Sequence, residues 1–168
     1  MSTADLVIRG GHVVERDGVR VADVVIRDGL VAEIAPSISA DGCEEIDAHG
    51  LHVFPGVIDS HVHFDEPGRT EWEGIASGTA ACAAGGVTTF VDMPLNSTPP
   101  LIDVTAFEAK LAAAERASLV DFAFWGGLVP GALDELGALA AKGVVGFKAF
   151  SCHSGIDEFA RADDLTLL

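Results

Sequence analysis

The stretch FPGVIDSHVHFDEPG, residues 54–68, decides the fold that we expect for this chain. Its apolar residues form an almost continuous run, which is typical of a strand buried on both faces, and His61 and His63 lie near the end of that run. Side chains alternate between the two faces of a strand, so the two imidazoles are predicted to point the same way. This is the spacing of a pair of metal ligands.

The composition indicates a globular protein and argues against several kinds of partner. The 168 residues are 49% hydrophobic and 21% charged, which is enough for a sizeable core. A net charge of −16 disfavours nucleic acids and anionic membranes, because both are bound mainly through Lys and Arg. No apolar run is long enough to span a bilayer, and the first residues lack the features of a secretory signal. We therefore expect a cytoplasmic protein, in which the three widely spaced cysteines are reduced.

Residues 1–53 have the pattern of a small antiparallel β domain. Short β-branched runs cover residues 6–14, 21–27 and 30–34. Asp28-Gly29, between two of these runs, is a strong signal for a hairpin turn. A further extended region is predicted within residues 44–53, which gives four or five strands in all.

Residues 54–168 alternate between strand and helix patterns. After the strand that carries His61, strands are predicted over residues 87–93, 120–129 and 144–150, and helices over residues 72–84, 104–117 and 133–141, with a fourth helix starting at residue 163. This alternation predicts an α/β domain with parallel strands and right-handed crossovers. Either a doubly wound sheet or half of an eight-stranded barrel fits, and the lack of a Gly-x-Gly-x-x-Gly motif after the first strand weakens a nucleotide-binding fold.

Polar residues are predicted to meet at the carboxyl ends of these strands, where α/β folds bind their ligands. Asn96 follows the second strand, and Lys148 lies in the fourth among apolar neighbours. Burial lowers the pKa of a lysine, and a neutral lysine amine reacts with carbon dioxide to form a carbamate that can bridge two metal ions. Together with His61 and His63, Lys148 would form part of a hydrolytic site with two metal ions.

Each of these residues also has an ordinary explanation. A His-x-His pair is about as often a packing or hydrogen-bonding feature as a metal site, and a single lysine in a strand more often extends to the surface. Asp59 is explained equally by hydrogen bonds to the backbone near the strand end, and Asn96 by the needs of its turn. The joint placement of these residues at one edge of the predicted sheet favours a site.

Three segments resemble the cyclic amidohydrolases, the family that includes dihydroorotase, hydantoinase and allantoinase. They are PGVIDSHVHFDEP (residues 55–67), AAGGVTTFVDMPLNSTPP (83–100) and GVVGFKAF (143–150). The resemblance implies an α/β fold, the first half of a metal-dependent hydrolase (β/α)8 TIM barrel preceded by part of a small β-sandwich domain. Residues 1–53 would belong to the sandwich and residues 54–168 would form the first four βα units.

The resemblance also implies a metal centre and its ligands. It implies two divalent metal ions, usually zinc, with His61 and His63 as ligands. Lys148 would be the bridging ligand after CO2 carboxylates its side-chain nitrogen, and Asn96 would contact the substrate. A metal-activated hydroxide would attack the ring amide, and an aspartate on the eighth barrel strand would transfer the proton.

A few positions bear on the choice within the family. Dihydroorotases carry an arginine for the substrate carboxylate at the position of Asp65, so dihydroorotase is disfavoured here. EPGRTEWEG (residues 66–74) and MPLNS (93–97) are similar to allantoinases, which implies a small cyclic ureide substrate and the hydrolysis of allantoin to allantoate. Dihydroorotase and hydantoinase remain alternatives. Arg69 could orient a ureido substrate, but a loop arginine is more often solvated, so it is not assigned to the site.

The length of the chain affects what it is expected to do. A complete barrel needs about 250 residues, so the family's other histidine ligands and its catalytic aspartate are expected beyond residue 168. No catalytic residue is then assigned within this chain, which is expected to be an inactive N-terminal portion of an enzyme that is a homotetramer when full length. The alternative from another class is a non-catalytic fragment that binds other proteins through its open sheet edge.

Overall fold

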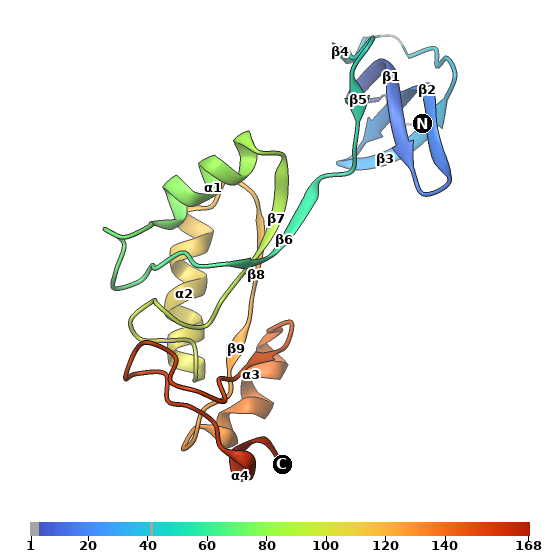
Figure 1. Cartoon of the computed structure of the whole chain (residues 1–168). Helices are drawn as coiled ribbons and strands as arrows, with labels where there is room; N and C mark the ends of the chain where they lie inside the picture. Colours follow the sequence, from blue (N-terminus) through green and yellow to red (C-terminus); the bar gives the residue numbers. More distant parts are fainter. Residues whose placement is uncertain (1–3, 41) are drawn as a thin grey trace. The chain divides into compact units, whose positions relative to one another are not determined.

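The computed structural model describes residues 4–40 and 42–168, and the chain divides into two compact units, Met1–Pro55 and Gly56–Leu168. The first unit is a five-stranded sheet, and the second combines parallel strands with helices (Figure 1). No helix in the described ranges is long and apolar enough to cross a membrane.

The first unit is built on two hairpins. Strand β1 (Leu6–Glu15) pairs antiparallel with β2 (Gly18–Arg27), and β2 pairs antiparallel with β3 (Leu30–Ala35). The turn between β2 and β3 has positive φ at both Asp28 (53°) and Gly29 (74°), as the favoured two-residue hairpin turn requires. The predicted hairpin at Asp28-Gly29 is confirmed.

The last two strands of this unit correct the expectation of an antiparallel domain. Strands β4 (Glu44–Asp47) and β5 (His52–Val53) both pair parallel with β1. The reason lies in the strand order β3-β2-β1-β4: the chain leaves the edge strand β3 and crosses to the other side of β1 before β4 begins. A crossing connection of this kind brings the next strand back in the same direction, which a hairpin does not.

Asp23 is the main buried polar group of the first unit. Its carboxylate accepts hydrogen bonds from the backbone N–H groups of Gly10 (2.9 Å) and Ile38 (3.1 Å) and from Arg9 Nη1 (2.9 Å). Burial acts to raise the pKa of Asp23, but these donors outweigh it and hold the pKa below its ordinary value. The ionised carboxylate therefore ties β2 to β1 and to the segment after β3.

This arrangement predicts how the first unit responds to acid. The pKa of Asp23 is lower in the folded chain than in the unfolded chain, where it is about 3.9. The stability that it contributes is therefore present at neutral pH and is lost as the pH falls from about 5 through the folded pKa. Asp23→Asn is expected to lower the free energy of unfolding at neutral pH and to flatten its decline in acid, as measured by urea unfolding followed by circular dichroism.

The control for this prediction is Glu15→Gln, because Glu15 pairs with Arg20 at the surface of the same unit. Exposed ion pairs contribute little to stability, so this variant is expected to behave nearly as the parent protein does. An acid slope that is the same in Asp23→Asn and in the parent would contradict the role given to Asp23.

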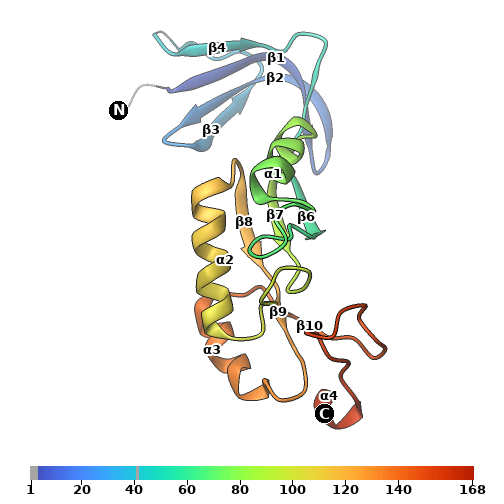
Figure 2. The same cartoon turned by 90° about the vertical axis from the view of Figure 1, so that its left-hand side faces the viewer.

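The second unit contains three neighbouring parallel strands in the order β6-β7-β8 (Figure 2). Helix α1 (Ile75–Ala84) connects β6 (Val57–Val62) to β7 (Val87–Asp92), and helix α2 (Val104–Ala117) connects β7 to β8 (Asp121–Phe124). Parallel pairing and the bounds of α2 are confirmed as predicted. Helix α2 begins where the Asp103 carboxylate accepts a hydrogen bond from the backbone N–H of Ala106 (2.7 Å), a typical N-cap.

The fourth strand and the remaining helices differ in detail from the prediction. The predicted strand 120–129 is divided at Trp125 into β8 and β9 (Gly126–Gly127), and the strand predicted over 144–150 is only β10 (Phe147–Lys148), parallel to β9. The division lets the chain pair with β7 before Trp125 and with β10 after it. The other elements are η1 (Leu133–Glu135), α3 (Leu136–Lys142) and α4 (Asp164–Leu167), while α1 starts three residues later than predicted because Gly74 remains extended.

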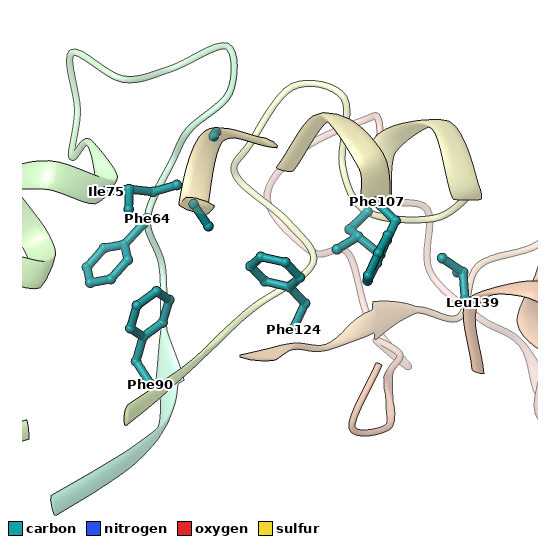
Figure 3. Close-up of a cluster of buried hydrophobic side chains, with 9 residues drawn as sticks. Phe64, Ile75, Phe90, Phe107, Phe124 and Leu139 are labelled. Atoms are coloured by element: carbon teal, nitrogen blue, oxygen red, sulfur yellow. The ribbon is translucent and has the colours of Figure 1, made fainter. Parts of the chain in front are cut away.

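The core of the second unit lies between the strands and the helices (Figure 3). Phe64 and Phe90 meet edge to face with ring centroids 4.9 Å apart, and Phe107 from α2 meets Phe124 from β8 in the same way at 5.8 Å. Fully burying a side chain of this kind contributes about 1.5–3 kcal/mol. Phe64 directly follows His63, so the core also anchors the end of the histidine-bearing segment.

The first strand of this unit is less buried than expected. Val57 is 53% exposed and Ile58 is 67% exposed, so the prediction of burial on both faces is wrong for β6 in this chain. The reason is that β6 pairs with β7 along one edge, and no strand among the described residues pairs with its other edge. The apolar sequence of β6 is typical of an interior strand, although among the described residues β6 is an edge strand.

Candidate functional site

His61 in β6 and His63 just after it lie side by side. Their ring centroids are 5.3 Å apart and the ring planes are inclined by 51°. His61 is exposed and His63, one residue beyond the end of the strand, is half-buried. The alternation of side chains along a strand correctly predicts that these two imidazoles share a face.

The backbone around His61 is irregular and is held by side chains. The register between β6 and β7 shifts between Asp59 and Val62, which takes backbone groups out of the ladder. Asp59 Oδ1 accepts a hydrogen bond from the His61 N–H (3.0 Å), and Trp125 Nε1 donates one to the Ser60 carbonyl (3.0 Å). Asp59 therefore bonds to the backbone near the strand end, the ordinary role predicted for it, and this hydrogen bond fixes the backbone of His61.

His63 contacts the loop that follows β7. Its Nδ1 lies 3.4 Å from the Leu95 carbonyl and 3.4 Å from Asn96 Nδ2. Donation from Nδ1–H to the carbonyl leaves the Nε2 lone pair free for a ligand. Burial lowers the pKa of His63, the Leu95 carbonyl acts in the opposite direction, and the nearby charge of Lys148 lowers the pKa further. His63 is thus neutral at neutral pH, the form that binds metals.

Asn96 is held in an unusual conformation beside His63. Its φ of 77° is in the left-handed region, which Asn tolerates better than most residues. Arg69 Nη1 donates a hydrogen bond to the Asn96 carbonyl (2.8 Å), and Arg69 Nη2 donates one to Glu158 Oε1 (3.1 Å). The Arg69 guanidinium also lies 5.0 Å from the centre of the Trp72 ring.

These contacts correct the expectation for Arg69. Its side chain is only 19% exposed and joins three loops, so it is not the solvated residue predicted from the sequence. The partners could not be read from the chain, because Glu158 lies 89 residues away. The one nearby signal in the sequence was Trp72, three residues after Arg69, on whose ring the Arg69 guanidinium lies.

Lys148 lies in β10 and is half-buried, in keeping with its apolar neighbours. Its Nζ is 5.0 Å from the centre of the Phe150 ring, and burial lowers the pKa of the amine. Lys148 lies at the carboxyl end of β10, which runs parallel to β9, and its positive charge adds to the lowering of the pKa of His63. The structure thus brings all four residues predicted for the site to one end of the strands, with Asn96 against His63.

Sequence reasoning missed a buried lysine behind this site. Lys110 Nζ lies 2.7 Å from Asp92 Oδ2, and each side chain is 1% exposed. A signal was present, because position 110 falls on the buried stripe of α2, three residues after Phe107 and four before Ala114. A lysine on that stripe must find an acceptor inside the protein.

The donors present fit part of a metal centre. Among residues 4–40 and 42–168, no group of three or more His, Cys, Asp or Glu side chains is placed to hold a metal ion. Two adjacent imidazoles and a lysine with a lowered pKa are nevertheless compatible with a metal pair once the lysine has become a carboxylate.

The second unit is thus a parallel α/β unit with paired histidines at the carboxyl end of its first strand, an arrangement that can be compared with known protein families. A model described as the amidohydrolase family matches residues 52–160, and the chain belongs to that family. The predicted fold class, part of the family's α/β barrel, is likewise confirmed by the solved structures that the chain matches.

The most similar relatives include several allantoinases. The chain is 60% identical to the allantoinase of Solibacter usitatus (strain Ellin6076) over 98% of its own length and 36% of that protein. It is 56% identical to the allantoinase of Desulfitobacterium hafniense (strain Y51) over 100% of its length and 37% of that protein. Among solved structures, L-hydantoinase (dihydropyrimidinase) from Arthrobacter aurescens matches with a TM-score of 0.87 and 35% identity, covering 98% of this chain and 37% of that one. The chain thus spans a little over a third of the proteins it matches.

Proposed function

We propose that this chain supplies the N-terminal part of an allantoinase, which hydrolyses the cyclic ureide allantoin to allantoate. The observation that carries the proposal is the 56–60% identity to allantoinases over essentially the whole chain. The adjacent imidazoles of His61 and His63 support it, because they offer the start of a metal centre at the ligand-binding end of the strands. In this proposal residues 1–53 belong to a β-sandwich domain, and residues 54–168 form the first four βα units of the barrel.

We propose His61, His63 and Lys148 as the residues that hold two divalent metal ions, with zinc the metal that best suits imidazole ligands. When bound, the metal ions supply a Lewis acid that lowers the pKa of water and polarises an amide carbonyl. His63 contributes a neutral ring whose Nδ1 is engaged by the Leu95 carbonyl, so that its Nε2 lone pair faces outward from that contact.

Lys148 is proposed to act as its carbamate. The neutral amine attacks carbon dioxide, a nitrogen–carbon bond forms, one amine proton leaves to solvent, and the product carries a negative charge. Burial supports this assignment, because it lowers the pKa of Lys148 and so increases the fraction of neutral amine. The apolar side chains beside Lys148 would also protect the carbamate from solvent.

Asn96 is proposed to orient the substrate. Its side-chain amide carries both a donor and an acceptor, which match the alternating N–H and C=O groups of a ureide. The contact of Arg69 with the Asn96 carbonyl supports this role by fixing the loop. The carboxylate that transfers the proton is expected in a part of the protein outside these residues. A homotetramer in the cytoplasm belongs to the same proposal.

Hydantoinase activity is the second candidate, because several of the solved structures that match are named hydantoinases, at 26–35% identity. Dihydroorotase is disfavoured by Asp65, a buried carboxylate 7% exposed, which would repel the carboxylate of dihydroorotate. The higher identity to allantoinases (56–60%) than to hydantoinases (26–35%) supports allantoin as the first candidate substrate.

The test is to express the protein from its complete reading frame with zinc and to compare hydrolysis of allantoin, hydantoin and dihydroorotate. We expect kcat/KM to be at least about 10-fold higher for allantoin than for the others. A chelator should abolish the activity and added zinc should restore it. Faster turnover of hydantoin would reassign the substrate. Lack of hydrolysis of all three by the metal-loaded protein would favour a non-catalytic binding role.

A further inference from the structure

The side chain of Lys110 is buried, and its amine contacts three polar groups. Besides the Asp92 carboxylate at 2.7 Å, Lys110 Nζ donates hydrogen bonds to the Phe64 carbonyl (3.3 Å) and to Ser97 Oγ (3.3 Å). The ion pair with Asp92 and the two hydrogen bonds give the buried amine three polar neighbours. Such a group fixes three points of the chain relative to one another.

Asp92 and Lys110 together hold both backbone groups of Phe64, the residue directly after His63. The Phe64 N–H donates to Asp92 Oδ1 (3.0 Å), while the Phe64 carbonyl accepts from Lys110. On the other side of His63, the Val62 carbonyl accepts from the Met93 N–H (2.9 Å). His63 thus lies between two residues whose backbones are held, one by the sheet and the other by the buried ion pair.

The third point lies on the loop that carries Asn96. Ser97 is 1% exposed and follows Asn96 directly, so the contact from Lys110 fixes the loop just beyond the residue with positive φ. The His63 ring in turn contacts Leu95 and Asn96 of the same loop. One ammonium group therefore joins the two segments that form the candidate site, and it does so from behind, without reaching the site itself.

Stability alone gives little reason for an ion pair here. The surrounding cluster contains Phe64, Phe90 and Phe107, and a buried ion pair usually contributes no more to stability than well-packed apolar residues would. What apolar residues cannot do is hold a carbonyl, a hydroxyl and a backbone N–H in a fixed arrangement.

We propose that Lys110 and Asp92 are positioning residues, which set the distance between His63 and Asn96 through the backbone of Phe64 and the side chain of Ser97. The functional meaning of this role rests on the proposed hydrolase site. Neither residue touches the substrate or a metal ion in this proposal.

The experiment compares three proteins that differ in ion pairs of helix α2. Lys110→Met alone would leave a buried carboxylate without its partner and is expected to unfold easily. The paired variant Lys110→Met/Asp92→Asn removes both charges and is expected to fold. The matched control is Lys142→Met/Glu108→Gln, which removes an exposed ion pair between α2 and α3.

Urea unfolding gives the stability of each protein, and two further quantities are measured. The first is the NMR signals of the histidine rings in histidine-labelled full-length protein without added metal, with His63 assigned by a His63→Gln variant. The second is kcat and KM for allantoin at saturating zinc. In the paired variant we expect the His63 signals to shift, those of His12 and His49 to stay in place, and kcat to fall by at least about 10-fold. The control should resemble the parent in all readouts.

A paired variant with unchanged His63 signals and unchanged kcat would overturn the proposal and leave the pair a purely structural feature. If the paired variant does not fold, Ser97→Ala decides the matter with a smaller change: shifted His63 signals support the proposal and unchanged signals overturn it. If the parent protein does not hydrolyse allantoin, the proposed function fails, while the NMR comparison still decides whether the pair positions His63.

Discussion

Lys148→Ala is expected to abolish the hydrolysis of allantoin and to lower the zinc content of the protein. Alanine has no amine that could take up carbon dioxide, so the carboxylate proposed to bridge the metal ions cannot form. Loss of even an outer hydrogen-bond partner of a metal ligand typically costs 10–100-fold in affinity or activity, so loss of a bridging ligand should cost more than about 100-fold. The measurements are the initial rate at saturating allantoin and the zinc content of the dialysed protein.

The matched control is Lys142→Ala, in which a lysine of α3 with a side chain 43% exposed is removed. It should leave the rate and the zinc content unchanged. Isotopically labelled bicarbonate should give a carbamate carbon signal in the parent and in Lys142→Ala but none in Lys148→Ala. If Lys148→Ala retained normal zinc and normal activity, Lys148 would be no more than a half-buried strand residue beside Phe150.

The second large effect is expected from the histidine pair. His63→Ala and His61→Ala should each reduce activity by more than about 100-fold and weaken zinc binding, because each removes one imidazole ligand. Their effects on stability should differ. His63 is half-buried against Leu95 and Asn96, whereas His61 is exposed, so only His63→Ala is expected to lower the thermal midpoint measurably.

His49→Ala is the control for the histidine variants, since the His49 side chain is 73% exposed and lies in the first unit. Zinc content, activity and thermal midpoint should all match the parent. Equal zinc binding by His61→Ala, His63→Ala and His49→Ala would remove the histidine pair from the metal centre, whatever the substrate proves to be.

The sequence predicted the features that depend on near neighbours in the chain. Asp28-Gly29 specifies its turn because both residues accept positive φ, and the apolar stripe of α2 repeats with the helical period. The adjacency of His61 and His63 follows from the alternation of a strand. Each of these signals is complete within a short segment.

The features that the sequence did not reveal depend on residues far apart. The partner of Arg69 is 89 residues away, and Lys110 bonds to a carbonyl 46 residues before it. A hydrophobic pattern tells which face of an element is buried, but it does not tell which acceptor will meet a polar side chain on that face. The exposure of β6 could not be predicted for the same reason. Its apolar residues indicate an interior strand, but their actual exposure depends on which other segments pack against them.

The hydrogen bonds of Lys110 also bear on the order in which the molecule can assemble. A chain made from its N-terminus exposes His61 and His63 well before residue 110 has been added. Until α2 has packed against the strands, Phe64 lacks the lysine contact to its carbonyl and Ser97 lacks its donor. With the positioning role proposed for Lys110, we expect His63 to reach its final arrangement beside His61 only after the core between α2 and the sheet has formed, late in folding.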